Sequence, residues 1–192
     1  IEVNRSLRVL DGAVVVFDGV AGVEPQSETN WRLADNYNVP RICYINKMDR
    51  SGASFTKCLD MILKRLSSRP LPVQIPIGSE DNFKGMIDLV EMQALVWDSD
   101  DKDSEWQTID VADGKGLADK LGITVPTDRK ILDDVLKYRS ELVDTCLEMD
   151  DEAMEKYLTD GHAPSADVLR ACLRKGTVTS AFNVVLCGSS YK

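Results

Sequence analysis

A short polar sequence, Asn46-Lys47-Met48-Asp49, follows directly after an apolar run, and its residue types suit the binding of a purine base. An ionised Asp49 can accept two hydrogen bonds, one from the ring N–H of guanine and one from its exocyclic amine. Adenine presents no such donor pair, so a polar site of this kind can reject it by roughly 10⁴-fold. Asn46 would hold the loop together and reach the purine edge, and the stem of Lys47 would lie across the base.

The same four residues also fit a polar turn after a strand, where Asn and Asp are common. Their position favours the binding interpretation. They follow residues 41–45, which read as a buried strand after Pro40. Open α/β sheets bind their ligands beyond the carboxyl ends of parallel strands. The sequence also fits the N-K-x-D pattern with which GTPases read guanine.

Length and composition limit the classes of protein and partner. A chain of 192 residues with 43% hydrophobic residues can form one domain, or one domain with a compact insertion. The net charge of −9 argues against a direct nucleic-acid face, because phosphate contacts need clustered Lys and Arg. It permits an acidic face that meets a basic protein partner.

The apolar runs are too short to span a membrane, and no secretory signal opens the chain. The cysteines have neither paired nor metal-type spacing, which predicts reduced thiols, no metal site and a cytoplasmic or organellar (mitochondrial or plastid matrix) location. They are Cys43, Cys58, Cys146, Cys172 and Cys187. Because the first residue is Ile1, we expect a fragment of a longer polypeptide.

Hydrophobic periodicity predicts a parallel α/β sheet in the first part of the chain. Helices are expected over 1–10, 24–37 and 53–66, with strands over 13–17 and 41–45. The apolar run at 13–17 is continuous, as in a strand that is covered on both faces.

The pattern changes after Pro70 to short alternating strands, which predict an antiparallel patch. Strands are expected over 72–78, 83–89, 92–97 and 106–111, a turn over 98–105, a loop over 112–127, and helices over 128–147, 151–158 and 164–174. A last strand at 182–187 returns to the parallel sheet. The fold class is therefore α/β with helices on both faces of the sheet, plus an α+β insertion. Residues 1–69 and 177–192 form the first unit, and residues 70–176 form the insertion.

Seven stretches along the whole chain match one family pattern in order. They are 8–13 (RVLDGA), 19–29 (GVAGVEPQSET), 46–50 (NKMDR), 74–78 (QIPIG), 83–89 (FKGMIDL), 174–177 (RKGT) and 187–192 (CGSSYK). The chain thus resembles part of the GTPase domain, with its insertion subdomain, of bacterial-type or organellar elongation factor G, the translocation factor of the ribosome. The resemblance implies part of a sheet of the P-loop GTPase type.

The resemblance also implies roles for residues at the guanine of GTP or GDP. Ser190 replaces an Ala whose backbone N–H contacts the guanine carbonyl in the family, and Ser189 braces that loop. Tyr191 would pack beside the base. The residues that hold guanine from the other loop are Asn46, Lys47 and Asp49.

The phosphate end of such a site is missing, since no G-x-x-x-x-G-K-[ST] occurs. In the family, the first switch with its Mg²⁺-binding hydroxyl and the catalytic histidine precede the region that begins here at Ile1. Phosphoryl transfer depends on positioning and charge stabilisation at the phosphates. We therefore expect a full-length GTPase that uses Mg²⁺, and a chain that has no catalytic residue and is inactive alone.

An acidic stretch over residues 128–160 carries eleven Asp or Glu against five Lys or Arg. An ordinary solvated helix face explains this equally simply. The resemblance implies a second interpretation, in which the insertion meets the basic domain of the ribosomal stalk protein. Candidate contacts are Asp133, Asp134, Glu141, Asp144 and Glu148.

Two alternatives to elongation factor G remain open. One is a related ribosome-associated GTPase of the release or ribosome-protection type, although the stretches at 74–78 and 83–89 favour elongation factor G. The other is a nucleotide-free module that docks on a protein through the insertion.

Overall fold

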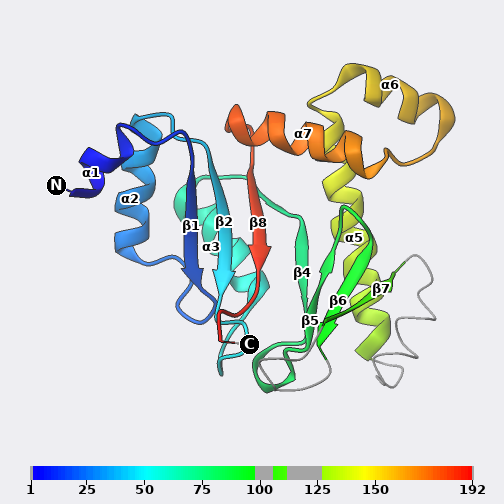
Figure 1. Cartoon of the computed structure of the whole chain (residues 1–192), viewed down its shortest axis with the longest axis horizontal. Coiled ribbons are helices and arrows are strands. Elements are labelled where there is room, and N and C mark those ends of the chain that lie inside the picture. The colour runs from blue at the N-terminus through cyan, green and yellow to red at the C-terminus, as the bar shows by residue number, and fades with distance from the viewer. Residues whose placement is uncertain (1, 98–105, 112–126, 192) are drawn as a thin grey trace.

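The structure is a computed structural model that describes residues 2–97, 106–111 and 127–191 (Figure 1). The described residues form two four-stranded sheets and the helices around them. The predicted turn at 98–105 and nearly all of the predicted loop at 112–127 lie outside these ranges.

The first sheet is parallel throughout, and its strands have the spatial order β1-β2-β8-β3. The strands are β1 (Ala13–Asp18), β2 (Arg41–Asn46), β8 (Asn183–Cys187) and β3 (Pro70–Pro72). In Figure 1 the arrows of β1, β2 and β8 point to one edge of the sheet, where the C-terminus also lies. The predicted α/β class is confirmed, with the carboxyl ends of three neighbouring strands at that edge.

Helices flank this sheet. They are α1 (Glu2–Leu7), α2 (Pro25–Asn36), α3 (Phe55–Leu66) and α7 (Ala166–Val178). The helix α3 begins where the Ser54 side chain accepts a hydrogen bond from the N–H of Lys57, which satisfies one free donor of the first turn. Its apolar face packs into the core, with Cys58 and Ile62 fully buried.

The second sheet is antiparallel, as predicted, with the order β4-β5-β6-β7. Its strands are β4 (Gln74–Ile77), β5 (Gly85–Asp88), β6 (Gln93–Trp97) and β7 (Trp106–Asp110), and a short 3₁₀ helix η1 (Glu80–Asn82) lies between the first two.

The chain passes from the first sheet to the second at Val73, inside what the sequence predicts as one strand over 72–78. The N–H of Val73 donates to the carbonyl of Val185 at 3.0 Å, and its carbonyl accepts from the N–H of Leu89 at 2.9 Å. The prolines at 70 and 72 cannot donate to a ladder, and they sit in β3 at the edge of the first sheet, where this loss is tolerated. The division of the chain at residues 70 and 177 stays a prediction.

In the described part of the chain, the second sheet is followed by α5 (Thr127–Leu147), α6 (Asp151–Asp160) and then α7. The Asp150 carboxylate caps α6 by accepting from the N–H of Ala153, and Gly161 ends it with a φ of 68°. Among the described residues, no helix is both long enough and apolar enough to cross a membrane.

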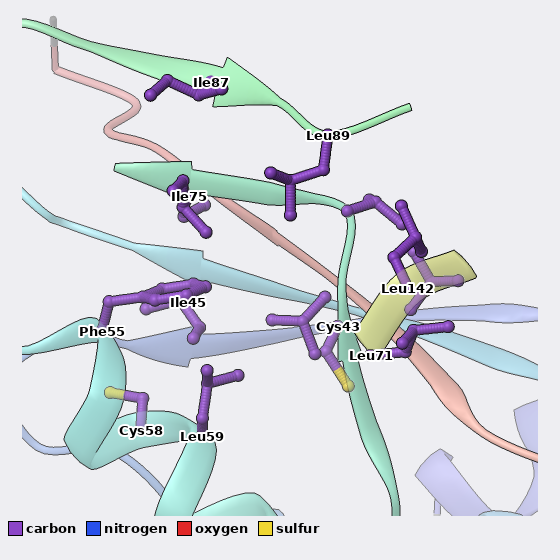
Figure 2. Close-up of a cluster of buried hydrophobic side chains, with 14 of the residues drawn as sticks. Cys43, Ile45, Phe55, Cys58, Leu59, Leu71, Ile75, Ile87, Leu89 and Leu142 are labelled. Atoms are coloured by element: carbon purple, nitrogen blue, oxygen red, sulfur yellow. The ribbon is translucent and has the colours of Figure 1, made fainter. Parts of the chain in front are cut away.

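One continuous hydrophobic core joins the two sheets (Figure 2). The labelled side chains come from α3, from β2 and β3, from the second sheet and the residue directly after β5, and from α5. Those labelled are Cys43, Ile45, Phe55, Cys58, Leu59, Leu71, Ile75, Ile87, Leu89 and Leu142. All five cysteines are buried free thiols, and burial raises the pKa of Cys43 to about 12. The second sheet is thus packed onto the first.

Candidate functional site

The loops that follow β1, β2 and β8 meet at the carboxyl edge of the parallel sheet. We call residues 46–54 the base loop and residues 188–191 the β8 turn. The N–H of Gly19 donates to the carbonyl of Asn46 at 2.8 Å, and the N–H of Met48 donates to the carbonyl of Gly188 at 3.2 Å. Parallel strands that end together therefore bring three polar loops into one place.

Asn46 joins the base loop to the β8 turn with its side chain. Its Oδ1 accepts from the N–H of Lys47 at 2.8 Å and from the N–H of Ser190 at 3.0 Å. Its Nδ2 donates to Ser190 Oγ at 3.2 Å. The N–H of Ser190 is therefore already used, and a contact between this N–H and a base carbonyl has to share or replace that bond.

Lys47 is held by Asp18, the last residue of β1. Its backbone is left-handed, with a φ of 63°, and its Nζ lies 2.6 Å from Asp18 Oδ2. The other oxygen of Asp18 accepts from the N–H groups of Val20 and Ala21. The Lys47 ammonium, followed by these backbone donors, holds the pKa of Asp18 below its ordinary value.

Sequence reasoning missed Asp18 as part of the site. One signal was available, because an acidic residue ends an apolar strand that lies beside the strand of the base loop. The register pairs Asp18 with Asn46, and that pairing puts the carboxylate next to Lys47. The register itself is not readable from either segment alone.

The Asp49 carboxylate is partly buried beside the fully buried side chain of Met48. It makes no hydrogen bond or ion pair with any residue in the described part of the chain. Both of its oxygens therefore keep their acceptor capacity. This is the property that paired donors on a guanine require.

The β8 turn is closed by its own serine. The N–H of Tyr191 donates to Ser189 Oγ at 3.1 Å, and the ring of Tyr191 is 71% exposed. At Gly188, a Cβ atom would come within 2.2 Å of the Tyr44 hydroxyl, so a larger residue there would have to displace the ring of Tyr44 on β2.

Four of the five acidic candidates lie on α5 and Glu148 directly follows it, so none of them belongs to these three loops. Asp133, Glu141, Asp144 and Glu148 are exposed, and Asp134 is partly buried. Glu148 already binds Arg69 through both oxygens, at 2.7 and 3.0 Å. The Arg69 guanidinium lowers the pKa of Glu148. Within the described ranges, no three His, Cys, Asp or Glu side chains are grouped so that they could hold a metal ion.

Comparison with solved structures finds the same fold in a crystal structure from Thermus thermophilus. The TM-score is 0.74 over 98% of this chain, at 22% sequence identity. This chain spans 25% of the length of that one. The family model described as the elongation factor Tu GTP binding domain matches residues 1–192. The chain therefore belongs to the elongation factor Tu GTP-binding domain family.

Proposed function

We propose that this chain recognises the guanine of GTP and GDP at the carboxyl edge of its parallel sheet. The observation that carries the proposal is the double link from Asn46 to Ser190, which joins the two predicted base-contacting loops. Beside them lies Asp49, whose carboxylate has no partner among the described residues. Fold and family support the same interpretation. The residues proposed to contact the nucleotide are Asn46, Lys47, Asp49, Ser189, Ser190 and Tyr191.

Each side chain has a separate task in this proposal. Asp49 accepts from the ring N–H and the amine of guanine, and it is left unpaired with adenine. The Lys47 stem covers the base plane, and the ion pair with Asp18 keeps its ammonium at the sheet edge. Asn46 fixes the spacing of the two loops and presents its amide towards the purine edge.

The phosphate end of the site is proposed to come from elsewhere in a full-length GTPase, together with Mg²⁺ and the catalytic groups. The exposure of the edge strand β1 supports this. Val14 and Val16 of β1 are 62% and 57% exposed, whereas the residues of the neighbouring strand β2 are alternately buried and half-buried. An exposed pair of β-branched residues on an edge strand suits the packing of further protein. GTP hydrolysis by the 192-residue chain alone would contradict this part of the proposal.

A titration with a fluorescent GDP analogue tests guanine recognition in the full-length protein. Asp49→Ala is expected to weaken binding by roughly 10³-fold, because a charged acceptor of two hydrogen bonds is lost. The matched control is Asp133→Ala, which removes the same group from α5 and should leave the affinity unchanged. Equal affinities for wild type and Asp49→Ala would favour the nucleotide-free docking module instead.

The full-length protein is proposed to act on the ribosome as a translocation factor of the elongation factor G type. The antiparallel sheet built from residues 74–110 supports this choice over the release and ribosome-protection types, since it contains the stretches that carry the resemblance. Sequence downstream of residue 192 decides between these relatives.

The insertion, residues 70–176, is proposed to bind the basic domain of the stalk protein. The exposed carboxylates on α5 would speed the encounter with a positively charged partner, in a manner that weakens as salt rises. Glu141 and Asp144 are the better candidates, because Glu148 already shares its charge with Arg69. An association rate that does not change with ionic strength would leave α5 as an ordinary solvated helix.

A further inference from the structure

A turn of the second sheet reaches into the base loop and holds it at two points. The N–H of Glu80, the first residue of η1, donates to the carbonyl of Met48 at 2.9 Å. The Glu80 carboxylate accepts from the N–H of Gly52 through Oε1 at 2.7 Å. Residues 48 and 52 lie on either side of Asp49 in the sequence, so these two bonds bracket the carboxylate that is proposed to read guanine.

The backbone of this turn has the special geometry that such a double contact needs. Glu80 is left-handed, with a φ of 57°, a region that non-glycine side chains rarely adopt. Gly78 has a φ of 77°, and a Cβ there would lie 2.0 Å from the carbonyl oxygen of Asn82. Gly52, the partner in the base loop, has a φ of 86°. Glycine adopts a positive φ without strain, so the two glycines suit their places, whereas the conformation of Glu80 is uncommon and persists because the surroundings hold it.

The turn is also firmly attached to the second sheet. Phe83, directly after η1, is 1% exposed and packs edge-on against Trp97 of β6, with ring centroids 5.4 Å apart. The N–H of Lys84 donates to the carbonyl of Ile77 at 3.0 Å and closes the turn between β4 and β5. Glu80 is thus an exposed residue whose backbone follows directly from a turn anchored in the second sheet.

We propose that Glu80 is a positioning residue for guanine recognition, through which the second sheet sets the place of Asp49. This rests on the proposed function above. Asn46 fixes the base loop on the upstream side of Asp49, and Glu80 fixes it on the downstream side. Downstream of Asp49, the loop is otherwise held by its own turn and, at its far end, by the bond from the N–H of Ser54 to the carbonyl of Gly19 at 3.0 Å. Without the bonds of Glu80, the segment between Asp49 and Ser54 loses its contact with the second sheet, and Asp49 loses part of the fixed geometry that two simultaneous hydrogen bonds require.

A pair of conservative substitutions separates this role from a general charge effect. Glu80→Gln keeps an oxygen that can accept from Gly52 but removes the charge. Glu80→Asp keeps the charge, tolerates the left-handed backbone, and is one methylene too short to reach the N–H of Gly52. Positioning predicts that Glu80→Asp lowers GDP affinity by roughly tenfold, whereas Glu80→Gln stays within about threefold of wild type. The opposite order would overturn the proposal.

Comparison with inosine diphosphate (IDP) adds a readout that a merely structural defect would not move. Hypoxanthine lacks the exocyclic amine, so its affinity depends less on the exact place of Asp49. The ratio of GDP to IDP affinity should therefore fall in Glu80→Asp and stay near the wild-type ratio in Glu80→Gln. The neighbouring exposed acid provides the matched control, since Asp81→Asn removes a charge from the same turn and should leave both affinities unchanged.

The outcomes distinguish the two proposals. If wild type does not prefer GDP to IDP and Asp49→Ala behaves as wild type, the proposed function fails. If wild type prefers GDP and Asp49→Ala abolishes the preference while Glu80→Asp retains it, the positioning role of Glu80 alone is wrong. Amide hydrogen exchange at Gly52 checks the physical cause, with faster exchange expected in Glu80→Asp than in Glu80→Gln.

Discussion

The parallel and antiparallel sheets of this protein share a core, yet they differ in where their loops can gather. In the parallel sheet, β1, β2 and β8 all end at one edge, so three polar loops meet there. In the antiparallel sheet, neighbouring strands run in opposite directions, and the connections alternate between two edges. A site made of several loops forms readily in the first arrangement and only through single turns in the second.

The second sheet therefore contributes to the candidate site in a different way. It supplies one turn, η1, whose Glu80 contacts the base loop, and it supplies apolar side chains to the common core. Val73 links the two sheets, because it bonds to Val185 of β8 and to Leu89, the residue directly after β5. In the proposed function, the first sheet presents the groups that contact the base, and the second sheet supports their loop.

The largest expected effect is a change in base preference on Asp49→Asn. Xanthine carries a carbonyl where guanine carries its amine, and an Asn side chain offers one acceptor and one donor in place of two acceptors. We expect GDP affinity to fall by roughly 10³-fold and xanthosine diphosphate affinity to rise above it. Isothermal titration of the full-length protein with both nucleotides measures the change. If Asp49→Asn keeps the wild-type preference for GDP over xanthosine diphosphate, Asp49 does not contact the base.

A second prediction concerns the shared core. Ile87 of β5 is fully buried within the cluster that joins the sheets, and Ile87→Ala should lower the free energy of unfolding by about 3 kcal/mol. Because the two sheets share this core, the loss of stability should appear in both sheets in a single unfolding transition. Single-tryptophan variants that keep Trp31 beside the first sheet or Trp97 in the second report the two regions separately. Two separated unfolding transitions would show that the sheets are independent.

The ion pair between Asp18 and Lys47 should make stability depend on pH. The folded-state pKa of Asp18 lies below its ordinary value of 3.8, chiefly because of Lys47. The stabilisation of the folded state by the ionised Asp18 is therefore fully present above about pH 4. It is lost as the pH falls through the lowered folded-state pKa. At pH 7, Asp18→Asn should cost about 1 kcal/mol or less, since both groups are partly exposed.

Urea unfolding at pH 7 and pH 3 measures this difference between wild type and Asp18→Asn. The gap between the two proteins should narrow at the lower pH, because pH 3 lies below the ordinary pKa of 3.8 and the carboxylate of the unfolded wild-type chain takes up a proton there. Asp60→Asn is a suitable control, because Asp60 is exposed on α3 and pairs only with Lys64 at 3.3 Å among the described residues. A gap that widens towards pH 3 would contradict the assigned sign.

The smallest effect is expected at the surface of α5. Glu148→Gln breaks the bidentate pair with Arg69, and we expect it to cost about 0.5 kcal/mol, less at high salt, because both side chains are nearly half exposed. Glu141→Gln removes an exposed charge with no such partner in the described part of the chain and should leave stability unchanged. The association rate with a basic stalk domain should show the opposite order. Glu141→Gln should slow association more than Glu148→Gln does.

Much of the fold is predictable because its signals are local. The apolar run of β1 and the capped, amphipathic α3 each carry their own pattern, and both elements form as expected. The expected cover on both faces of β1 is not seen in the described part of the chain, because β1 is an edge strand there and exposes Val14 and Val16. The meeting of Asn46 and Ser190 also follows from reading both as strand ends in one parallel sheet. The parts that were missed depend on contacts between distant segments.

Three such features illustrate the limit. The chain leaves the first sheet after β3 and enters the second at β4, yet the sequence over 72–78 predicts a single strand. The break depends on the position of Pro70 and Pro72 in the edge strand of the first sheet. The bond from Lys47 to Asp18 depends on the register of two strands, since 29 positions separate the residues. The bonds from Glu80 to the base loop require the second sheet to be folded and packed first. Sequence pattern and periodicity do not show which distant segments come into contact in these three places.

A crystal structure of the full-length protein with GDP tests the central claim most directly. The account predicts that both Asp49 oxygens accept hydrogen bonds of about 2.7–3.0 Å from the ring nitrogen and the amine of guanine, with the base between Lys47 and the β8 turn. A guanine bound elsewhere, or bound here with Asp49 turned away from the base, would contradict it.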